Sequence, residues 1–304
     1  MAAAVLAALT LSVCSVAVSA AARPQDPAPR RVYDAKANAF VEWDAMVAAL
    51  AKQNVVFVGE QHDDPNTHRL ELALLESLAL LKSRVVVSLE MFERDTQDSV
   101  THYLDGSLEE ATFLIDARPW PRYATDYKPL VEFAKSKKWP VVAANVPRPI
   151  AAEVSKSGWA PLDEKSDAEK KFFAADRQCP TGADEYFKKF LEAMGTHPAP
   201  GQTAEAAAQM AERFYFAQCL KDETMAESIA TAHAAEQDPA PVVVHYNGAF
   251  HSDYTLGTAA RVKRRLPNAR ISVVTVIPVK SLDDATPTDD QRRRGDFIVY
   301  TIGK

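Results

Sequence analysis

Short apolar runs alternate with helical patterns along most of this chain. The runs are rich in Val and other β-branched or aromatic residues, as buried strands are, and lie at 55–58, 85–89, 141–144, 242–246 and 271–277. Between the first two runs, leucines from 70 to 81 recur at helical spacing. This alternation is typical of parallel βαβ units, so we predict an α/β fold with a mostly parallel open sheet flanked by helices. A last apolar run at 297–302 is expected to form an antiparallel strand at the edge of the sheet.

The segment from 149 to 235 departs from this alternation. It is rich in Ala, Glu and Lys with helical periodicity, and it shows no strand pattern. Because it begins just after the run at 141–144, it should leave the sheet at the carboxyl end of that strand. We therefore predict that 149–235 forms a helical cap subdomain inserted over that edge of the sheet.

Two of the predicted strands end in a glycine that is followed three residues later by a histidine. The first pair is Gly59 and His62, and the second is Gly248 and His251. One Gly-x-x-His match is common by chance, but two matches at strand ends indicate a shared site. A glycine at this place lets the backbone turn sharply and lets a ligand approach, because it has no Cβ.

The carboxyl ends of parallel strands meet at one edge of a sheet, and ligands usually bind there. The polar residues expected at this edge are Glu60, His62, Glu90, Asn145, Arg148 and His251. The imidazoles could ligate a metal, act as general bases or bind haem iron. The carboxylates could complete a metal shell or orient an imidazole, and the arginine could pair with a carboxylate or a propionate. Any one of these residues alone could be an ordinary loop residue, so the hypothesis depends on their convergence.

The remaining histidines show no comparable pattern. His245 lies inside a predicted strand and is expected to be a hydrogen-bonded core residue. His68, His102, His197 and His233 lie on helical or loop patterns and are expected at the surface.

The beginning of the chain has the composition of a signal peptide. Residues 1–22 contain no charged side chain, are almost all Ala, Val, Leu and Ser, and end in small residues. Residues 23–31 are Pro-rich and polar, as in a linker. We therefore expect a protein of the periplasm or another extracytoplasmic compartment. A lipid anchor at Cys14 is the less favoured alternative, because the bulky Val13 precedes that cysteine.

Charge and cysteine content narrow the interpretation further. The formal net charge of −6 comes from mixed signs without a basic block of interleaved aromatics, so nucleic acid is not an expected partner. Export leaves two cysteines, Cys179 and Cys219, which lack the Cys-x-x-Cys spacing of a redox motif. In an oxidising compartment such a pair usually forms a structural disulfide, which we predict here.

Taken together, several motifs resemble the ChaN family of haem-binding uptake proteins, which is related to the TIKI/TraB and erythromycin-esterase-like groups. The resemblance runs from about 54 to 278. The motifs that carry it are Gly-Glu-Gln-His-Asp at 59–63, Leu-Glu-Met-Phe at 89–92, the stretch 120–134 with Tyr127, Asn-Val-Pro-Arg at 145–148, the stretch 218–226, and Gly-Ala-Phe-His at 248–251.

This resemblance implies an exported, often lipid-anchored α/β protein with a helical subdomain, which binds haem in iron acquisition. The haem-binding domain would span 32–304, after the signal peptide and the linker. The expected partners are haem and an outer-membrane or envelope uptake system, and a homodimer in which two chains share a site remains open.

Haem binding is the leading hypothesis. The candidates for the iron ligand are His62, His251 and Tyr127. Met225 and the cap helices could form the apolar slot, and Arg148 could bind a propionate. The chain has no Cys-x-x-Cys-His motif, so covalent haem attachment is excluded.

A metal-dependent hydrolase is the alternative, because relatives in the wider superfamily use paired Gly-x-x-His motifs for proteolysis or ester hydrolysis. Glu60, His62, Glu90 and His251 would then hold a divalent metal such as zinc or manganese and activate water. A third hypothesis is an exported interaction domain with a vestigial site. The same residues serve the first two hypotheses, so the sequence does not choose between them.

Overall fold

The computed structural model describes residues 28–195, 203–235 and 241–303 of the chain. The predicted signal peptide, Cys14, His197 and residues 23–27 of the predicted linker lie outside the described residues. Within the described ranges, none of the helices combines the length and the apolar character of a membrane span.

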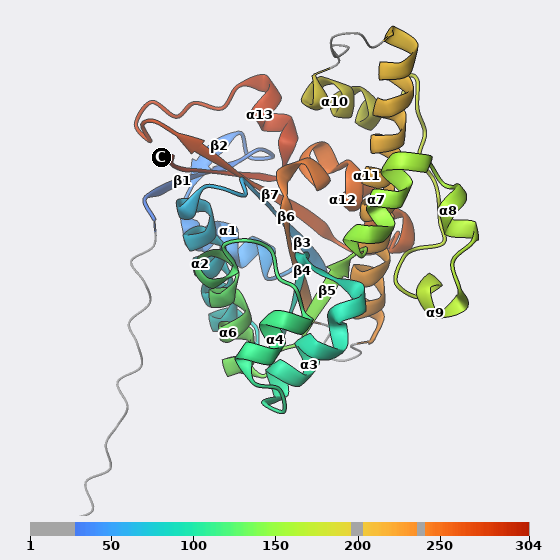
Figure 1. The fold of residues 1–304 in the computed structure, drawn as a ribbon. Helices are drawn as coiled ribbons and strands as arrows, with labels where there is room; N and C mark the ends of the chain where they lie inside the picture. Colours follow the sequence, from blue (N-terminus) through green and yellow to red (C-terminus); the bar gives the residue numbers. More distant parts are fainter. Residues whose placement is uncertain (1–27, 196–202, 236–240, 304) are drawn as a thin grey trace, which may run out of the picture.

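A mostly parallel sheet lies at the centre of the molecule (Figure 1). Its eight described strands run in the order β2-β1-β8-β7-β3-β6-β4-β5. They are β1 (Arg30–Asp34), β2 (Ala39–Val41), β3 (Val55–Glu60), β4 (Val85–Glu93), β5 (Val141–Asn145), β6 (Val242–Gly248), β7 (Ile271–Val279) and β8 (Phe297–Ile302). The strands from β8 to β5 are parallel, whereas β1 and β2 add antiparallel pairs beyond β8. The predicted fold class is confirmed.

The prediction for the last strand was wrong. β8 does not lie at the edge of the sheet, because it pairs in parallel with β7 and antiparallel with β1. The hairpin of β1 and β2 takes the outer position. β1 begins at Arg30 and therefore includes the last two residues of the predicted linker. Its sequence, Arg-Arg-Val-Tyr-Asp, has too few consecutive apolar residues to stand out as a strand.

Helices cover both faces of the sheet (Figure 1). One face is covered by α1 (Trp43–Leu50), α2 (Pro65–Leu81), α3 (Gln97–Asp105), α4 (Glu110–Asp116), α5 (Tyr123–Asp126) and α6 (Lys128–Lys137). The other face is covered by α11 (Ala204–Ala235) and α12 (Gly257–Arg265). The remaining helical elements are η1 (Arg94–Thr96), α7 (Arg148–Ser157), α8 (Ala160–Asp163), α9 (Asp167–Lys170), α10 (Glu185–Met194), η2 (Ala249–His251), η3 (Asp253–Thr255) and α13 (Asp289–Arg294).

The alternation of side chains along each strand decides which face a residue joins. In β3, Val56 and Val58 pack in the core with α1 and α2, whereas Val55 and Phe57 pack in the core with α11 and α12. Glu60 continues the first set at the end of β3, so its carboxylate turns toward α2.

Side chains alternate along β4 in the same way, but its glutamate faces the opposite side of the sheet from Glu60. Val87 and Leu89 pack on the α2 face, and Val86 packs on the α11 face. Glu90 continues the set of Val86, so its carboxylate turns toward α11. The two glutamates that the sequence placed at one edge therefore point toward opposite faces of the sheet.

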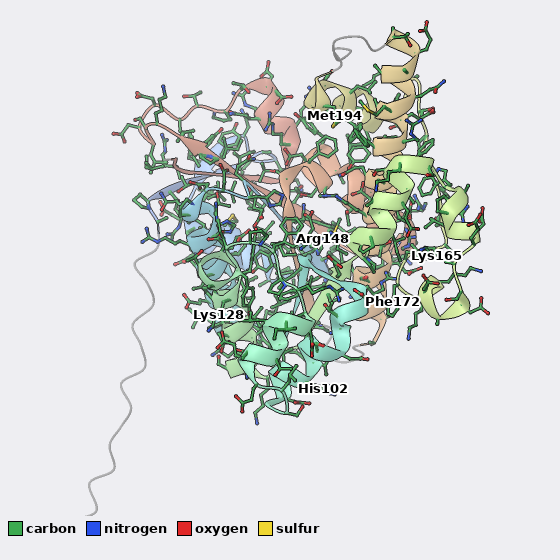
Figure 2. The ribbon with its side chains drawn as sticks, in the orientation of Figure 1. His102, Lys128, Arg148, Lys165, Phe172 and Met194 are labelled. Atoms are coloured by element: carbon green, nitrogen blue, oxygen red, sulfur yellow. A yellow bond between two sulfur atoms is a disulfide. The ribbon has the colours of Figure 1, made fainter. Side chains whose placement is uncertain are left out.

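The described part of 149–235 contains five helices, α7 to α11, and no strand. Ala226 and Ile229 of α11 pack directly on the sheet, while α10 and the first half of α11 rise beyond the carboxyl edge (Figure 1). Met194, at the end of α10, is labelled in this projecting part in Figure 2. The predicted disulfide between Cys179 and Cys219 is confirmed, and it joins the segment before α10 to α11.

Candidate functional site

The two Gly-x-x-His motifs lie side by side, because β3 and β6 are neighbours in the middle of the sheet. Glu60 lies opposite Gly248 in the parallel register. Beyond β6 the chain turns into η2, which ends at His251. The fold therefore brings both predicted histidines to the carboxyl edge of two adjacent strands.

Each glycine makes room for the other motif. A Cβ atom added to Gly248 would lie 2.6 Å from Nε2 of His62. A Cβ atom added to Gly59 would lie 3.0 Å from the Cα atom of Ala249. Separations this short are repulsive, so the absence of both side chains lets the two motifs pack together.

His62 is the more accessible of the two histidines. Its side chain is 47% exposed, and its Nδ1 is hydrogen-bonded to the buried carboxylate of Glu60. The ring lies edge-on to Trp120, with 5.2 Å between the ring centroids. Partial burial lowers the pKa of His62, but the hydrogen bond to Glu60 and the charges of Glu60 and Glu90 outweigh burial and raise it.

His251 is buried and held at both ring nitrogens. Nδ1 lies 2.7 Å from Oδ1 of Asp222, and Nε2 lies 3.3 Å from Oε1 of Glu90. Burial lowers the pKa of His251, but the charges of the two carboxylates and their hydrogen bonds outweigh burial and raise it to about 10. The other oxygen of Glu90 accepts a hydrogen bond of 2.7 Å from the backbone N–H of Gly248. His251 is therefore an imidazolium between two carboxylates at neutral pH.

Asp222 of α11 is a site residue that the sequence analysis missed. It is fully buried, and it accepts hydrogen bonds of 2.8 Å from Thr258 and from the hydroxyl of Tyr186. Burial would raise the pKa of Asp222, but the charges of His251 and Arg261 lower it. No local signal in the sequence marks it, because polar residues such as Gln218, Lys221 and Glu227 recur through this part of α11.

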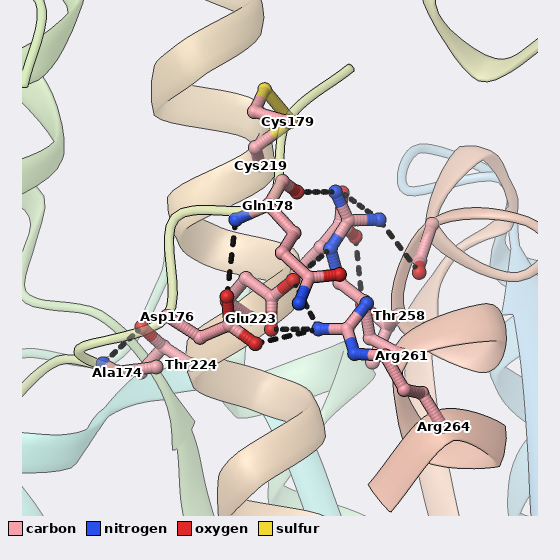
Figure 3. A network of polar contacts seen from close by, with 12 residues as sticks. Ala174, Asp176, Gln178, Cys179, Cys219, Glu223, Thr224, Thr258, Arg261 and Arg264 are labelled. Atoms are coloured by element: carbon pink, nitrogen blue, oxygen red, sulfur yellow. Dashed lines mark hydrogen bonds and ion pairs between the residues drawn. A yellow bond between two sulfur atoms is a disulfide. The ribbon is translucent and has the colours of Figure 1, made fainter. Parts of the chain in front are cut away.

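A second buried carboxylate, Glu223, anchors the network behind Asp222 (Figure 3). Arg261 donates from Nε to Glu223 over 2.9 Å, and it also donates to the backbone carbonyl of Gln178 over 3.2 Å. Arg264 donates to the same carboxylate over 2.6 Å. Gln178 precedes the disulfide cysteine Cys179, so the network joins α12, α11 and the disulfide-linked segment behind the site.

A cavity of about 710 Å³ opens at this edge of the sheet. This volume lies within the range of roughly 300–1,000 Å³ that is usual for small-molecule and cofactor sites. Its lining combines the two histidines and four acidic residues with aromatic rings and cations. The acidic residues are Glu60, Glu90, Glu192 and Asp253, and the rings and cations include Trp120, Tyr186, Phe250, Lys189, Lys221 and Arg294. A ligand with a flat apolar body and anionic groups matches this combination.

Three other predicted site residues do not line this cavity. Tyr127 is buried, and its hydroxyl donates to Oε1 of Glu60 over 2.8 Å. Met225 is fully buried in α11. Arg148, labelled in Figure 2 at the start of α7, pairs with Glu93 over 2.9 Å. Asn145 has a structural role, because its Nδ2 donates to the backbone carbonyl of Glu90 over 3.0 Å.

The four predicted metal ligands fall into two separate pairs. Glu60 holds His62 on the α2 side, and Glu90 holds His251 on the α11 side. No three of these four residues bring their ligand atoms within 4.8 Å of one another. The alternation of side chains along β3 and β4 explains this division, because it turns the two glutamates to opposite faces.

His68 contradicts the prediction that it lies at the surface. It is 4% exposed, and its Nδ1 lies 3.0 Å from Oε2 of the fully buried Glu71, one turn further along α2. These two polar residues fall on the stripe of α2 that also buries Leu74 and Leu78. That stripe was the signal for a buried histidine, because helical periodicity placed it among core positions.

The other described histidines differ in their outcomes. His102 is exposed, as predicted, and His233 is half-buried. His245 is a core residue, as predicted, and its Nδ1 lies 2.8 Å from the hydroxyl of Ser88. Burial lowers the pKa of His245 to about 3, so this ring is neutral.

Comparison with known proteins identifies the family. The family model described as haem-binding uptake, Tiki superfamily, ChaN matches residues 46–262. The chain belongs to this family. The predicted resemblance is confirmed, and no curated protein matches the sequence. The solved structure titled for cofacial haem binding to ChaN of Campylobacter jejuni is 15% identical, has a TM-score of 0.64, and covers 90% of this chain and 97% of its own chain. This similarity shows a common fold.

Two further solved structures are more distant. A Bacillus cereus protein is 10% identical with a TM-score of 0.48, and covers 84% of this chain and 90% of its own. The RRSP effector domain of a Vibrio vulnificus MARTX toxin is 15% identical with a TM-score of 0.39, and covers 84% of this chain and 37% of its own.

Proposed function

We propose that this chain is an exported haem-binding protein of a haem or iron uptake system. Haem binds in the cavity at the carboxyl edge of the sheet, with His62 as an iron ligand. Membership of a family described as haem-binding uptake supports the choice of ligand. The environment of the His62 imidazole is the observation that supports the location.

His62 has the properties of an axial ligand. Its side chain is half-exposed at the cavity, and Glu60 engages only Nδ1. A carboxylate on Nδ1 fixes the tautomer with a free lone pair on Nε2 and makes that nitrogen a better ligand. His251 lacks this freedom, because Asp222 and Glu90 hold both of its nitrogens.

The remaining lining fits the rest of a haem molecule. Tyr186 and Phe250 are stacked with 5.0 Å between their ring centroids, and Trp120 stands beside His62. Such rings offer flat apolar surface to a porphyrin. Lys189 and Lys221 line the same cavity, and within the described residues neither has an ion-pair partner, although the ammonium of Lys189 lies over the ring of Tyr254 at 3.6 Å from its centroid. These cations are available to propionates, which bound haem would supply together with its iron centre.

Export is the second part of the proposal. The composition of residues 1–22 supports a signal peptide, and a disulfide between Cys179 and Cys219 suits an oxidising compartment. The protein would then act in the periplasm or another extracytoplasmic compartment. A lipid anchor at Cys14 remains the less favoured form of the same proposal.

A haemin titration of the purified protein, followed by visible absorbance, tests the haem site. The variants are His62→Ala and, as a matched control, His102→Ala, which removes an exposed imidazole from α3 (Figure 2). We expect a saturable Soret shift at micromolar protein in the wild type. We expect His62→Ala to weaken it by more than about tenfold, and His102→Ala to leave it unchanged.

A Soret shift that is indifferent to His62 would overturn the proposed location. The protein has a second, mostly apolar cavity of about 780 Å³ at the opposite edge of the sheet, lined by Val86, Leu104 and Trp139 among others. None of the described residues that line that cavity is a histidine, so haem bound there would show the same spectrum in both histidine variants. The absence of any saturable shift would overturn haem binding itself.

A further inference from the structure

A buried group of three metal-ligating side chains lies on the α2 side of the sheet, behind the haem cavity. Glu60 comes from the end of β3, and His68 and Glu71 come from the first turns of α2. One ligand atom from each residue can be chosen so that all three lie within 4.8 Å of one another. Ligands around a single ion at about 2.0–2.2 Å would have such mutual separations.

Burial sets this group apart from an ordinary acidic cluster. Glu60, His68 and Glu71 are 2%, 4% and 0% exposed. Oε2 of Glu60 and Oε1 of Glu71 are both buried without a hydrogen-bond partner. A buried carboxylate oxygen without a partner is costly, because no water compensates for its lost hydration. Two such oxygens therefore point to a missing positive partner.

The surroundings prepare each side chain for ligation. Tyr127 and His62 occupy Oε1 of Glu60, which leaves Oε2 facing His68 at 3.5 Å from its Nδ1. Nε2 of His68 lies 3.2 Å from the backbone carbonyl of His62 and 3.4 Å from Oδ2 of Asp126. An imidazole that donates from Nε2 to these acceptors keeps the Nδ1 lone pair free for a metal.

We propose that Glu60, His68 and Glu71 form a second, buried site for one divalent transition-metal cation, such as zinc or manganese. A set of two carboxylates and one imidazole suits these borderline cations. Asp126 orients His68 from behind, and Arg122 in turn pairs with Asp126 over 2.6 Å. Without a cation, burial, the charge of Glu60, a side-chain hydrogen bond to Glu60 and the charge of Asp126 raise the pKa of Glu71 well above its usual range.

This site is distinct from the haem cavity. None of its ligands except Glu60 lines that cavity, and His251 and Glu90 take no part in it. Glu60 connects the two sites, because one of its oxygens holds His62 and the other faces the metal. A bound cation would pull electron density from this carboxylate and so lower the basicity that Glu60 gives to His62.

Metal content after refolding tests the proposal. Because the three ligands are buried, the full protein should be unfolded in urea with a chelator, and then refolded with zinc or manganese. The bound metal is measured by mass spectrometry after gel filtration. We expect about one metal ion per chain in the wild type and a higher melting temperature than in the metal-free protein. Glu71→Gln should lose both effects.

Matched variants distinguish a metal held by these three side chains from a metal bound elsewhere on the protein. Glu71→Gln keeps the shape of the side chain and removes its charge, and circular dichroism reports whether it folds. If it does not fold, His68→Gln replaces it. The control Glu76→Gln removes a half-buried carboxylate from the same helix and should keep the metal. His62→Ala should keep the metal but lose haem, so failure of one proposal is distinguishable from failure of the other.

Two outcomes would overturn the proposal. In the first, neither cation remains bound and neither raises the melting temperature, so a proton alone compensates the buried carboxylates. In the second, the metal is lost in His62→Ala or His251→Ala and kept in Glu71→Gln, which would place the ion in the open cavity.

Discussion

Gly248 lies directly against the imidazole of His62, and a Cβ atom on this glycine would come within 2.6 Å of Nε2. The backbone of Gly248 has φ −54° and ψ 132°, which any residue can adopt. The glycine is therefore required for space next to His62 and not for backbone conformation. This steric requirement accounts for a glycine at the end of β6, beside the first motif.

Replacing Gly248 by Ala should displace the His62 ring without unfolding the protein. His62 is half-exposed and can move away, so we expect the free energy of unfolding to fall by less than about 1 kcal/mol. Haem affinity should fall, because the moved imidazole no longer presents Nε2 in the same place. Urea unfolding and haemin titration of the same preparation measure the two effects.

Gly59→Ala is the contrasting variant. Its added Cβ would meet the backbone of Ala249, the first residue of η2, at 3.0 Å, and a packed backbone atom cannot move as a half-exposed ring does. We expect a loss of about 1–3 kcal/mol in stability, as for overpacking in a core. If Gly248→Ala were the more destabilising of the two, or left haem affinity unchanged, the steric role assigned to Gly248 would be wrong.

The sequence was sufficient to predict the parallel sheet and the meeting of the two Gly-x-x-His motifs. The alternation of side chains along the strands also predicts that Glu60 and Glu90 face opposite sides of the sheet, because residues at even spacing share a face. That rule divides the four expected metal ligands into two pairs. At a strand end, however, a turn can change the direction of a side chain, so periodicity alone does not decide which face it joins.

Other features depend on packing between distant segments. Asp222 becomes a partner of His251 only when α11 lies along the sheet, and no local pattern places it there. β8 lies inside the sheet because the β1–β2 hairpin covers it, and strand direction has no signature in a short apolar run. His68 is buried because Glu71 and Asp126 satisfy it, and its polarity alone suggested the surface.

His251 should make the stability of the protein depend on alkaline pH. Its folded-state pKa is raised from 6.5 to about 10 by Glu90 and Asp222, against the effect of burial. The stabilising imidazolium is fully present below about pH 6.5 and is lost as the pH rises through about 10. At pH 7, His251→Gln leaves two buried carboxylates without their cation and should cost about 3–5 kcal/mol.

The difference in unfolding free energy between wild type and His251→Gln, measured in urea from pH 6 to pH 10, tests this. We expect the difference to shrink steadily toward pH 10. His102→Gln, which changes an exposed histidine, should show no difference at any pH. A constant gap between wild type and His251→Gln would mean that His251 is not charged in the folded protein.

Lys221 should contribute to haem affinity through a propionate. It lies on α11 at the cavity, partly buried and without an ion-pair partner among the described residues. Lys221→Gln removes the charge and keeps most of the side-chain length. We expect haem binding to weaken by about fivefold, which corresponds to about 1 kcal/mol for a partly exposed ion pair.

The salt dependence of the same titration distinguishes a charge effect from a change in shape. The effect of Lys221→Gln should diminish at 1 M salt, where exposed charges are screened within about 3 Å. Lys156→Gln, on the exposed side of α7, makes the same charge change away from the cavity and should leave affinity unchanged. Equal effects of the two variants would indicate that the overall electrostatic potential of the protein attracts haem, and not a direct contact between Lys221 and a propionate.

The disulfide between Cys179 and Cys219 should stabilise both the fold and the site. It closes a sequence separation of 40 residues, for which the loss of chain entropy in the unfolded state corresponds to about 4 kcal/mol. Dithiothreitol should lower the urea midpoint of the wild type and leave that of a Cys179→Ala, Cys219→Ala double variant unchanged. The double variant should resemble the reduced wild type.

Haem affinity gives the second part of this prediction. Gln178, next to the disulfide, accepts a hydrogen bond from Arg261, and Asp184 further along the same segment caps α10 through the N–H of Phe187. α10 contributes Tyr186 to the cavity, so a loosened segment should weaken haem binding as well as stability. If the double variant loses stability but binds haem as the wild type does, α10 is held by its packing on α11 alone, and the disulfide serves only the fold.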